Sequence, residues 1–513
     1  MELDKLVLTP PQMRTAELAA SAHGVDVKKL MDNAGETLGR RVLTVAQKLM
    51  KDNIVFLCGS GNNGGDGYVA VDFLLSSAAH ITVVRCGEPK TDLAKAAFAL
   101  VKKRCEIISL DEAVDSKDVL SSAGVIVDCV FGIGFTGELS SDLQRLFLRA
   151  ALSDAYKISC DVPSGINSLN GRICPNTFEA DETITFHKPK LGMLLSPAKE
   201  CCGKVTVADI GIGDYVDEYC DNKIFTTDKA FVSSLLPYRT ENAHKGIFGR
   251  VTLVCGSRLY PGAAMIAAAS AMRSGVGMVN LCCAVNAIPP LASSMPECTY
   301  TPVPCDTIGF FSPDAIDSVM EQIDKSEAAV IGCGLGFTDS TKTLVHEIIR
   351  RSKTPLILDA DGINCISGHI DILKEKQTEI VLTPHPTELA RLCGTDTQSV
   401  MQDLFGHACE IANQYGVVVH AKNTQTLTVI GDQCYLTDFG CSALSKGGSG
   451  DMLAGLIGGL AAQGIATDRA CVLADYIMGT SARELCRDQS PRGVLASDII
   501  ARFPRTFFEM EHE

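Results

Sequence analysis

Short apolar runs alternate with amphipathic, helix-like segments along the first half of the chain. The apolar runs fall at residues 54–58, 81–86, 124–130 and 157–161. The helix-like segments fall at residues 66–78, 91–103 and 139–151. This alternation predicts a parallel sheet with helices on both faces, which is an α/β fold of three αβα layers. Ligands of such sheets bind at the carboxyl ends of the strands.

A second alternating series begins at Arg250. Its strand-like runs fall near residues 278–283, 328–332, 355–359, 379–383, 416–420 and 426–436. Two long Ala/Gly/Leu-rich helices, near 449–463 and 467–487, are predicted to close the chain. The charged, turn-rich stretch 213–229 lies between the two series. We therefore expect a domain over 1–215, a linker over 216–229 and a second domain over 230–513.

Composition narrows the function classes. A chain of 513 residues is too long for a single core, so two or three domains are expected. The net charge of −15 argues against nucleic-acid partners and anionic membranes, and no apolar stretch is long enough to cross a bilayer. The 22 cysteines show no Cys-x-x-Cys spacing, which favours buried, reduced thiols and a cytoplasmic location over disulfides or zinc.

A glycine-rich segment directly follows the first apolar run. Five glycines lie within nine residues: Gly59, Gly61, Gly64, Gly65 and Gly67. Asn62, Asn63 and Asp66 stand between them, and a helical pattern follows from about residue 68. Strand, glycine turn and helix together direct backbone N–H groups toward a phosphate. The asparagine and aspartate side chains are candidates for additional ligand contacts.

Two further polar loops follow strand-like runs. Asp128 precedes the glycine-rich segment 131–137, which is suited to a second phosphate or to a simple turn. Asp161 opens the segment Asp-Val-Pro-Ser-Gly at 161–165, where a carboxylate serves either catalysis or turn capping. Each of these loops taken alone leaves both interpretations open.

Taken together, the three loops resemble the NAD(P)H-hydrate epimerase family over about residues 10–215. The resemblance implies a Rossmann-like domain, Asp161 as the acid–base residue, and a K⁺ site built from Asn63, Asp128 and Ser164. It also implies that the loops 62–66 and 132–138 hold the hydrated dinucleotide. The implied contacts are Asn62, Asn63, Gly64, Gly65, Asp66, Gly132, Ile133, Gly134, Phe135, Thr136, Gly137, Glu138 and Asp161. Lys190 matches a family lysine more loosely, and a solvated surface lysine is the alternative.

The second half carries a Gly-Gly-Ser-Gly-Asp sequence at 447–451, at the start of a long apolar helix. Consecutive N–H groups there form an anion site, and Asp451 is placed to take a proton from a substrate hydroxyl. A flexible helix cap is the simpler alternative. This sequence resembles the ribokinase-like superfamily. Five further segments, at 245–251, 256–264, 332–336, 358–364 and 382–388, narrow the resemblance to ADP-dependent NAD(P)H-hydrate dehydratase over about 230–505.

That resemblance implies the ligands of the second domain. Ala264, Gly334, His385 and Asp451 would contact the hydrated dinucleotide. The adenine nucleotide would contact Gly450 and the segment Lys422, Asn423, Thr424, Gln425 and Thr426. The chain departs from the family at Asn423, Lys446 and Cys333, which puts the nucleotide pocket in question more than Asp451.

The expected function is the repair of hydrated NADH and NADPH. One domain would interconvert the C6 epimers with K⁺, and the other would dehydrate the S form with ADP and Mg²⁺. The alternatives are a small-alcohol kinase fused to a non-catalytic nucleotide-binding domain, and a first domain that only binds ligand or RNA. We expect small-molecule substrates and a homo-oligomer. The sequence leaves open the choice of ADP or ATP and of NADHX or NADPHX.

Overall fold

The computed structural model describes residues 5–77, 79–116, 118–221, 223–240 and 242–512. The chain divides into two compact units, Met1–Lys223 and Ile224–Glu513. The division falls inside the stretch expected to be a linker. That stretch is built from short elements: a 3₁₀ turn at Asp214–Tyr219, β9 (Lys223–Thr226) and α9 (Lys229–Ser233).

The first unit is built around a seven-stranded sheet in the order β4-β3-β2-β5-β6-β7-β8, with every neighbouring pair parallel. The strands are β2 (Asn53–Cys58), β3 (His80–Arg85), β4 (Glu106–Ser109), β5 (Val125–Cys129), β6 (Tyr156–Cys160), β7 (Glu182–Phe186) and β8 (Lys204–Ala208). The predicted αβα architecture is confirmed, and the four predicted strands agree with the structure to within about one residue.

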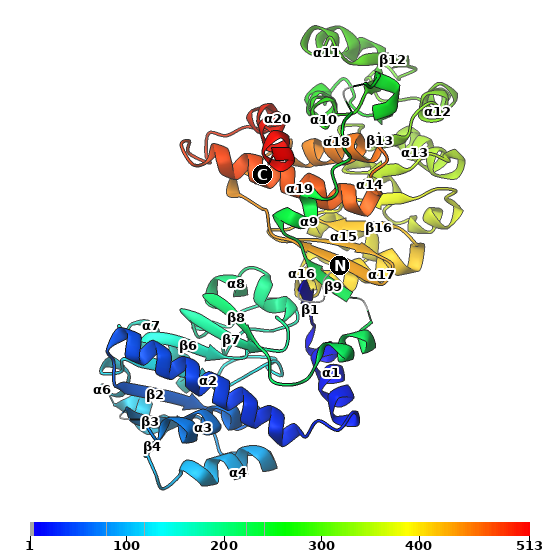
Figure 1. Ribbon diagram of the computed structural model, residues 1–513. Helices are drawn as coiled ribbons and strands as arrows, with labels where there is room; N and C mark the ends of the chain where they lie inside the picture. Colours follow the sequence, from blue (N-terminus) through cyan, green and yellow to red (C-terminus); the bar gives the residue numbers. More distant parts are fainter. Residues whose placement is uncertain (1–4, 78, 117, 222, 241, 513) are drawn as a thin grey trace. The chain divides into compact units, whose positions relative to one another are not determined.

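Helices cover both faces of this sheet (Figure 1). On one face α2 (Val27–Leu49) packs on α3 (Asn62–Leu74), which packs on α4 (Asp92–Val101). On the other face α5 (Leu110–Asp115), α6 (Asp118–Ser121) and α7 (Ser141–Ala151) pack together, and Leu146 and Phe147 of α7 join the core formed with Val55 and Ile126. α1 (Pro10–Ala22), α8 (Ala198–Cys201) and β1 (Leu6–Val7) complete the unit.

The order of the strands reverses between β2 and β5. From β2 the chain proceeds outward to β3 and β4, then returns to place β5 on the other side of β2. A crevice forms at the carboxyl ends of the strands at such a switch point. The Gly59–Gly67 region follows β2, and the loop with Gly132 follows β5. The fold therefore brings the predicted loops together.

The second unit contains a larger mixed sheet in the order β9-β18-β17-β16-β15-β14-β13-β10-β11-β12. Its strands are β10 (Arg250–Val254), β11 (Met278–Ala284), β12 (Thr299–Val303), β13 (Ala328–Ile331), β14 (Leu356–Leu358), β15 (Ile380–Leu382), β16 (Val418–Ala421), β17 (Thr426–Ile430) and β18 (Gln433–Thr437). Pairing is parallel from β16 through β12, and antiparallel in the β16-β17-β18 ribbon.

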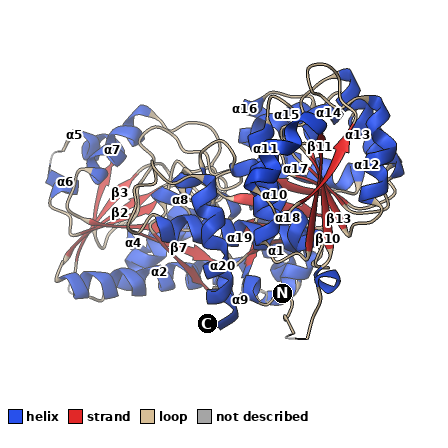
Figure 2. Ribbon diagram, turned by 90° about the horizontal axis from the view of Figure 1, so that it is seen from above, coloured by secondary structure: helices blue, strands red, loops and turns tan. Residues whose placement is uncertain are grey.

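Two layers of helices enclose this sheet, as Figure 2 shows. One layer comprises α10 (Pro261–Arg273), α18 (Ser449–Ala461), α19 (Thr467–Leu485) and α20 (Ala496–His512). The other comprises α12 (Ile316–Ile323), α13 (Asp339–Arg351), α14 (Asp361–Ile366), α15 (Pro386–Cys393) and α17 (Leu404–Tyr415), with α16 (Thr397–Gln402) beside α15 and α17. α11 (Ile288–Ser294) precedes β12.

Three features of the second unit differ from the sequence prediction. The single strand expected over 426–436 is a hairpin, because Gly431 adopts φ +53° and turns the chain. The strand β12 was not predicted, and α20 follows the two helices expected to close the chain. None of the helices in the described part of the chain has the length and apolar character that a bilayer crossing needs.

Candidate active sites

The first unit has a cavity of about 680 Å³ at the carboxyl ends of β2, β5 and β6. Most of the predicted dinucleotide contacts line it: Asn62, Asn63, Asp66, Gly132, Ile133, Gly134, Phe135, Thr136, Glu138 and Asp161. Gly64, Gly65 and Gly137 are not part of its lining. Helix α3 begins at Asn62, earlier than the sequence indicated, so Gly64 and Gly65 lie in its first turn. A Cβ on Gly64 would meet the Gly59 carbonyl oxygen at 2.1 Å, so this glycine permits close packing.

Asp161 stands at the end of β6 in a strained conformation, with φ +64°. Its Oδ1 accepts a 2.6 Å hydrogen bond from Lys190 Nζ, and its Oδ2 accepts one from the Ile133 N–H at 3.3 Å. Strained non-glycine residues of this kind concentrate at functional sites. The side chain of Asp161 is 11% exposed, so it reaches the cavity while remaining largely enclosed.

Lys190 is fully buried, so the surface alternative for this residue is wrong. Its ammonium donates to Asp161 Oδ1, Thr185 Oγ1 and the Phe186 carbonyl oxygen. All three contacts involve oxygens, which compensates the cost of burying the charge. The pair keeps a carboxylate in place beside the cavity.

Three ionisable side chains of the cavity wall, Glu17, Arg14 and Asp66, contribute to the electrostatics of the site. Glu17 and Arg14, both on α1, were not identified from the sequence. Burial raises the pKa of Glu17, and the nearby Asp161 carboxylate raises it further. Burial also holds the pKa of Asp66 well above its ordinary value. Arg14 reaches the glycine loop, where its guanidinium lies 3.7 Å from the position of a Cβ on Gly134.

The residues of the predicted K⁺ site lie at the same end of the sheet. Asp128 is fully buried and accepts hydrogen bonds from the Ser164 N–H at 2.8 Å and the Ser164 hydroxyl at 2.7 Å. The buried side-chain oxygen and nitrogen of Asn63 have no hydrogen-bond partner. A buried amide without partners carries a desolvation cost, so this side chain is suited to a ligand or an ion.

The second unit has a cavity of about 620 Å³ beside the start of α18. Lys422, Asn423, Thr424, Thr426, His385 and Gly450 line it, as the sequence predicted for ligand-binding residues. Gln425 is buried outside the lining and donates a 3.0 Å hydrogen bond to Asp438 Oδ1. Successive side chains of an extended segment point to opposite sides, which separates Gln425 from Thr424 and Thr426.

Asp451 lies in the first turn of α18, close to Cys333 and Asp359. The ligand atoms of these three side chains lie within 4.8 Å of one another. Burial and the Asp359 carboxylate together raise the pKa of Asp451 to about 6, against a hydrogen bond from Cys333 and the charge of Lys422. A carboxyl with this pKa is ionised near neutrality yet accepts protons readily.

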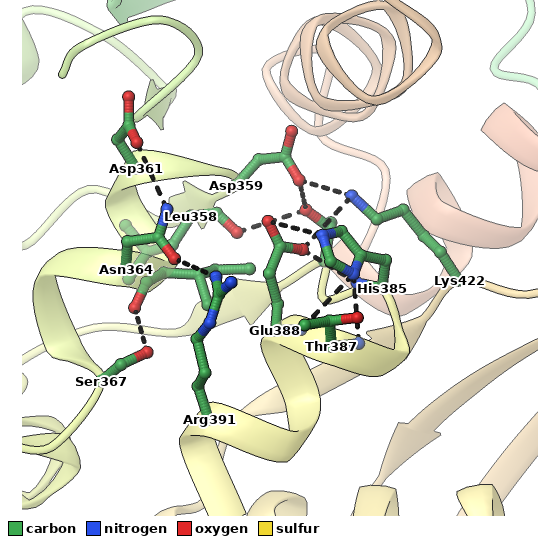
Figure 3. A network of polar contacts seen from close by, with 12 residues as sticks. Leu358, Asp359, Asp361, Asn364, Ser367, His385, Thr387, Glu388, Arg391 and Lys422 are labelled. Atoms are coloured by element: carbon green, nitrogen blue, oxygen red, sulfur yellow. Dashed lines mark hydrogen bonds and ion pairs between the residues drawn. The ribbon is translucent and has the colours of Figure 1, made fainter. Parts of the chain in front are cut away.

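A network of polar contacts joins Asp359, Lys422, Glu388 and His385 (Figure 3). Lys422 Nζ donates to Asp359 Oδ1 at 2.7 Å and lies 4.0 Å from Glu388 Oε2. Burial raises the pKa of Glu388 to about 6, although Lys422 opposes the shift. A Cβ on Gly450 would lie 3.4 Å from Asp359 Oδ2 and 3.6 Å from Lys422 Nζ, so this network borders the start of α18.

His385 caps helix α15. Its Nδ1 accepts hydrogen bonds from the N–H groups of Thr387 and Glu388, at 3.2 and 3.4 Å. In return, the His385 N–H donates a hydrogen bond to Glu388 Oε2. Burial and the neighbouring Lys422 lower the pKa of this histidine, which favours the neutral ring. Its capping role is therefore structural, while the imidazole edge still faces the cavity.

Three of the four predicted dinucleotide contacts, Ala264, Gly334 and Asp451, lie outside the lining of this cavity, although Gly450 next to Asp451 is part of it. Ala264 is fully buried on α10, where it contacts the backbone of Gly256, and Gly334 adopts φ +63° against Tyr260. Two departures from the family pattern have structural explanations. Lys446 Nζ donates hydrogen bonds to the carbonyl oxygens of Arg492 and Val494. Cys333 forms a side-chain hydrogen bond with Asp451.

Comparisons with known proteins agree with these two sites. Residues 251–505 match the family model described as NAD(P)H-hydrate dehydratase, and residues 27–192 match that of the YjeF-related protein N-terminus. A bifunctional NAD(P)H-hydrate repair enzyme from Moorella thermoacetica is 30% identical over 507 residues, which cover 97% of this chain and 95% of the relative.

Two solved structures resemble the second unit. A ribokinase-like superfamily protein from Enterococcus faecalis has a TM-score of 0.50 and 21% identity, over 56% of this chain and 97% of that one. An ADP/ATP-dependent NAD(P)H-hydrate dehydratase from Bacillus subtilis, crystallised with ATP and Mg²⁺, has a TM-score of 0.48 and 30% identity, over 55% and 98%. The first of these confirms the ribokinase-like fold.

Two α/β units with carboxylates at the ends of their parallel strands define a two-site enzyme. The chain belongs to the family of bifunctional NAD(P)H-hydrate repair enzymes.

The buried Lys422–Asp359 pair predicts a strong stability effect. Lys422→Met leaves Asp359, which is 3% exposed, without its cation, and we expect a loss of about 3–5 kcal/mol in unfolding free energy. Asp359→Asn in the same chain removes the unpaired charge and should recover part of this loss. Lys374→Met breaks an exposed Lys–Asp pair and should cost less than about 1 kcal/mol. Urea unfolding of the wild-type protein, these three variants and Asp359→Asn alone measures the effects, and additive effects of the Lys422 and Asp359 changes would contradict the pairing.

Proposed function

We propose that this chain restores hydrated NADH and NADPH in two steps, one in each unit. The first unit interconverts the C6 epimers of the hydrated coenzyme, and the second dehydrates the S epimer at the expense of ADP. The observation that carries this proposal is that each unit of a chain in this family has its own cavity next to a largely enclosed carboxylate. Asp161, at the end of β6, lines the first cavity, and Asp451 follows Gly450, which lines the second, in the first turn of α18.

In the second unit, Asp451 is the general base. It removes the proton of the C6 hydroxyl, and the oxygen attacks the β-phosphate of ADP, which releases AMP. The ring nitrogen then expels phosphate, and loss of a proton from C5 restores the double bond. The backbone N–H groups of 447–450 stabilise the charge that develops on the phosphate.

The cavity beside α18 supplies the nucleotide site. Lys422, Asn423, Thr424, Thr426 and Gly450 bind the adenine nucleotide, and Gln425 supports this segment through its bond to Asp438. Of the residues that the family resemblance assigns to the hydrated dinucleotide, His385 contacts it from the cavity wall, Gly334 lies outside that wall, and the fully buried Ala264 supports the site by packing. Mg²⁺ would arrive with the phosphates, since it usually keeps several waters and takes only one or two carboxylates. Asp359 is suited to be such a carboxylate ligand, because the hydrogen bonds from Lys422 and Thr383 both go to its Oδ1 and leave Oδ2 for the ion.

In the first unit, Asp161 is an acid–base group at C6, and Lys190 keeps its carboxylate in position. Asn62, Asn63, Asp66 and the loop 132–138 hold the dinucleotide around it. Small molecules are the substrates of both units. Homo-oligomer formation and a cytoplasmic location are further expectations from the sequence. The family matches and the full-length relative favour coenzyme repair over the small-alcohol kinase alternative.

The direct test uses a mixture of NADHX epimers with ADP. The wild-type protein should restore all of the NADH, followed by its absorbance, in a fast phase for the S epimer and a slower phase for the R epimer. Asp161→Ala should lose the enzymatic part of the slow phase and keep the fast one. A stable phosphate ester in place of released phosphate would establish a kinase instead, and parallel reactions with ATP identify the donor.

The pKa of Asp451 predicts the pH dependence of dehydration. Its carboxyl must be ionised to act as a base, so kcat/KM for the S epimer should fall about tenfold per pH unit below pH 6, the pKa given by burial. Asp451→Asn should lower the rate by roughly 10²–10⁴. Glu388 also has a pKa of about 6, so Glu388→Gln serves as the control and should keep the acid limb. A limb that disappears with Glu388→Gln would reassign the base.

The unpartnered Asn63 amide supports the K⁺ site. Asn63, Ser164 and Asp128 offer hard oxygen atoms, and the buried Asn63 oxygen has no protein donor. Such an ion would orient the loop after β5, whose Phe131 N–H donates a hydrogen bond to Ser164 Oγ.

We expect K⁺ at 100 times its Kd to add about 2.7 kcal/mol to the stability of the first unit, measured by thermal unfolding against choline chloride. Asn63→Ala should abolish this difference, and an equal effect of choline would contradict the site.

A further inference from the structure

Glu17 is a carboxyl group that neither the family resemblance nor the fold explains. It lies on α1, half-buried in the wall of the first cavity. Among the described residues, no hydrogen bond or ion pair engages its carboxyl oxygens. Charged side chains that remain enclosed without a partner are costly, so they usually have a ligand or a chemical role.

Inversion at C6 requires groups on two sides of the ring. The hydroxyl must leave from one face as water, which takes a proton from an acid. Water must then add to the other face and give a proton to a base. Asp161, fixed by Lys190 and the Ile133 N–H, serves one face only. Glu17 and Asp161 reach the same cavity from different elements, since Glu17 lies on α1 and Asp161 follows the end of β6.

We propose that Glu17 is the second acid–base group of the first cavity, and that it acts on the face of the nicotinamide ring opposite Asp161. This inference rests on the epimerisation proposed above.

The charged groups around Glu17 suit a side chain that both donates and accepts a proton. Burial and Asp161 raise its pKa, which favours the neutral acid, whereas Lys190, Arg14 and His187 oppose the shift and stabilise its anion. The other carboxyl that faces it, Asp66, has a pKa well above its ordinary value through burial, Asp161 and Glu17. The causes of the Asp66 shift include no cation, unlike those of the Glu17 shift, so the anion of Asp66 is the less favoured of the two.

The step balances in protons and electrons. Glu17 gives a proton to the C6 hydroxyl, the C6–O bond breaks with both electrons leaving on water, and the lone pair of N1 stabilises the resulting cation. A water molecule forms the new C6–O bond on the opposite face, and its proton passes to the Asp161 carboxylate. The reverse reaction, or exchange with solvent, restores both groups.

The test uses the full chain, whose second unit reports its own integrity. With NADHX epimers and ADP, Glu17→Gln should keep the fast phase and slow the second by roughly 10²–10⁴, toward the uncatalysed rate left in Asp161→Ala. Glu17→Asp should recover part of the rate. Glu36→Gln, which removes a partly exposed carboxylate on α2, should leave both phases unchanged.

A pH profile separates chemistry from positioning. The wild-type second phase should decline at high pH, as Glu17 loses the proton that it must donate, and this alkaline limb should be absent in Glu17→Gln. A second phase of wild-type rate in Glu17→Gln, or an alkaline limb that persists in this variant, would overturn the proposal. If the wild-type protein itself stops at half recovery, the epimerase function fails, whatever the role of Glu17.

Discussion

Both units depend on a lysine ammonium paired with an aspartate carboxylate at the end of a parallel strand. Lys190 lies 2.6 Å from Asp161 in the first unit, and Lys422 lies 2.7 Å from Asp359 in the second. Removing such charges from water is expensive, and only close pairing with further hydrogen bonds compensates the cost. Each lysine also has a second oxygen neighbour, Thr185 for Lys190 and Glu388 for Lys422.

These pairs set the electrostatic character of the cavities. Burial, and after it the neighbouring fixed anion, raises the pKa of a second carboxyl in each unit: Glu17 beside Asp161, and Asp451 beside Asp359. Each unit therefore contains carboxyl groups with different proton affinities in one enclosed space. Such an arrangement lets one fold class run acid and base chemistry at the same pH. Both cavities lie beside the first turn of a helix, α3 in the first unit and α18 in the second.

The sequence predicted the strands and loops of the site better than the partners of its side chains. The alternation of apolar runs and the spacing of glycines located Gly59–Gly67, Gly132 and Asp161, because the backbone geometry of these loops requires those residue types. The sequence leaves the place of Lys190 open, since nothing local indicates that the turn after β7 folds its ammonium into the core. Glu17 carried no signal either: a lone glutamate on an amphipathic helix normally faces water. The Gly431-Asp432 pair is typical of a hairpin turn, and the alternation of side chains along an extended segment accounts for the direction of Gln425.

The bond network of Lys446 has a consequence for the integrity of the second unit. Its ammonium is tied to the carbonyl oxygens of Arg492 and Val494, in the segment that leads into α20. The loop that precedes α18 is thus anchored by residues from the last part of the chain. A fragment that ended after α19 would retain every side chain assigned to the nucleotide, yet its phosphate-binding turn would lose this tether. The minimal autonomous catalytic fragment therefore has to extend past Val494.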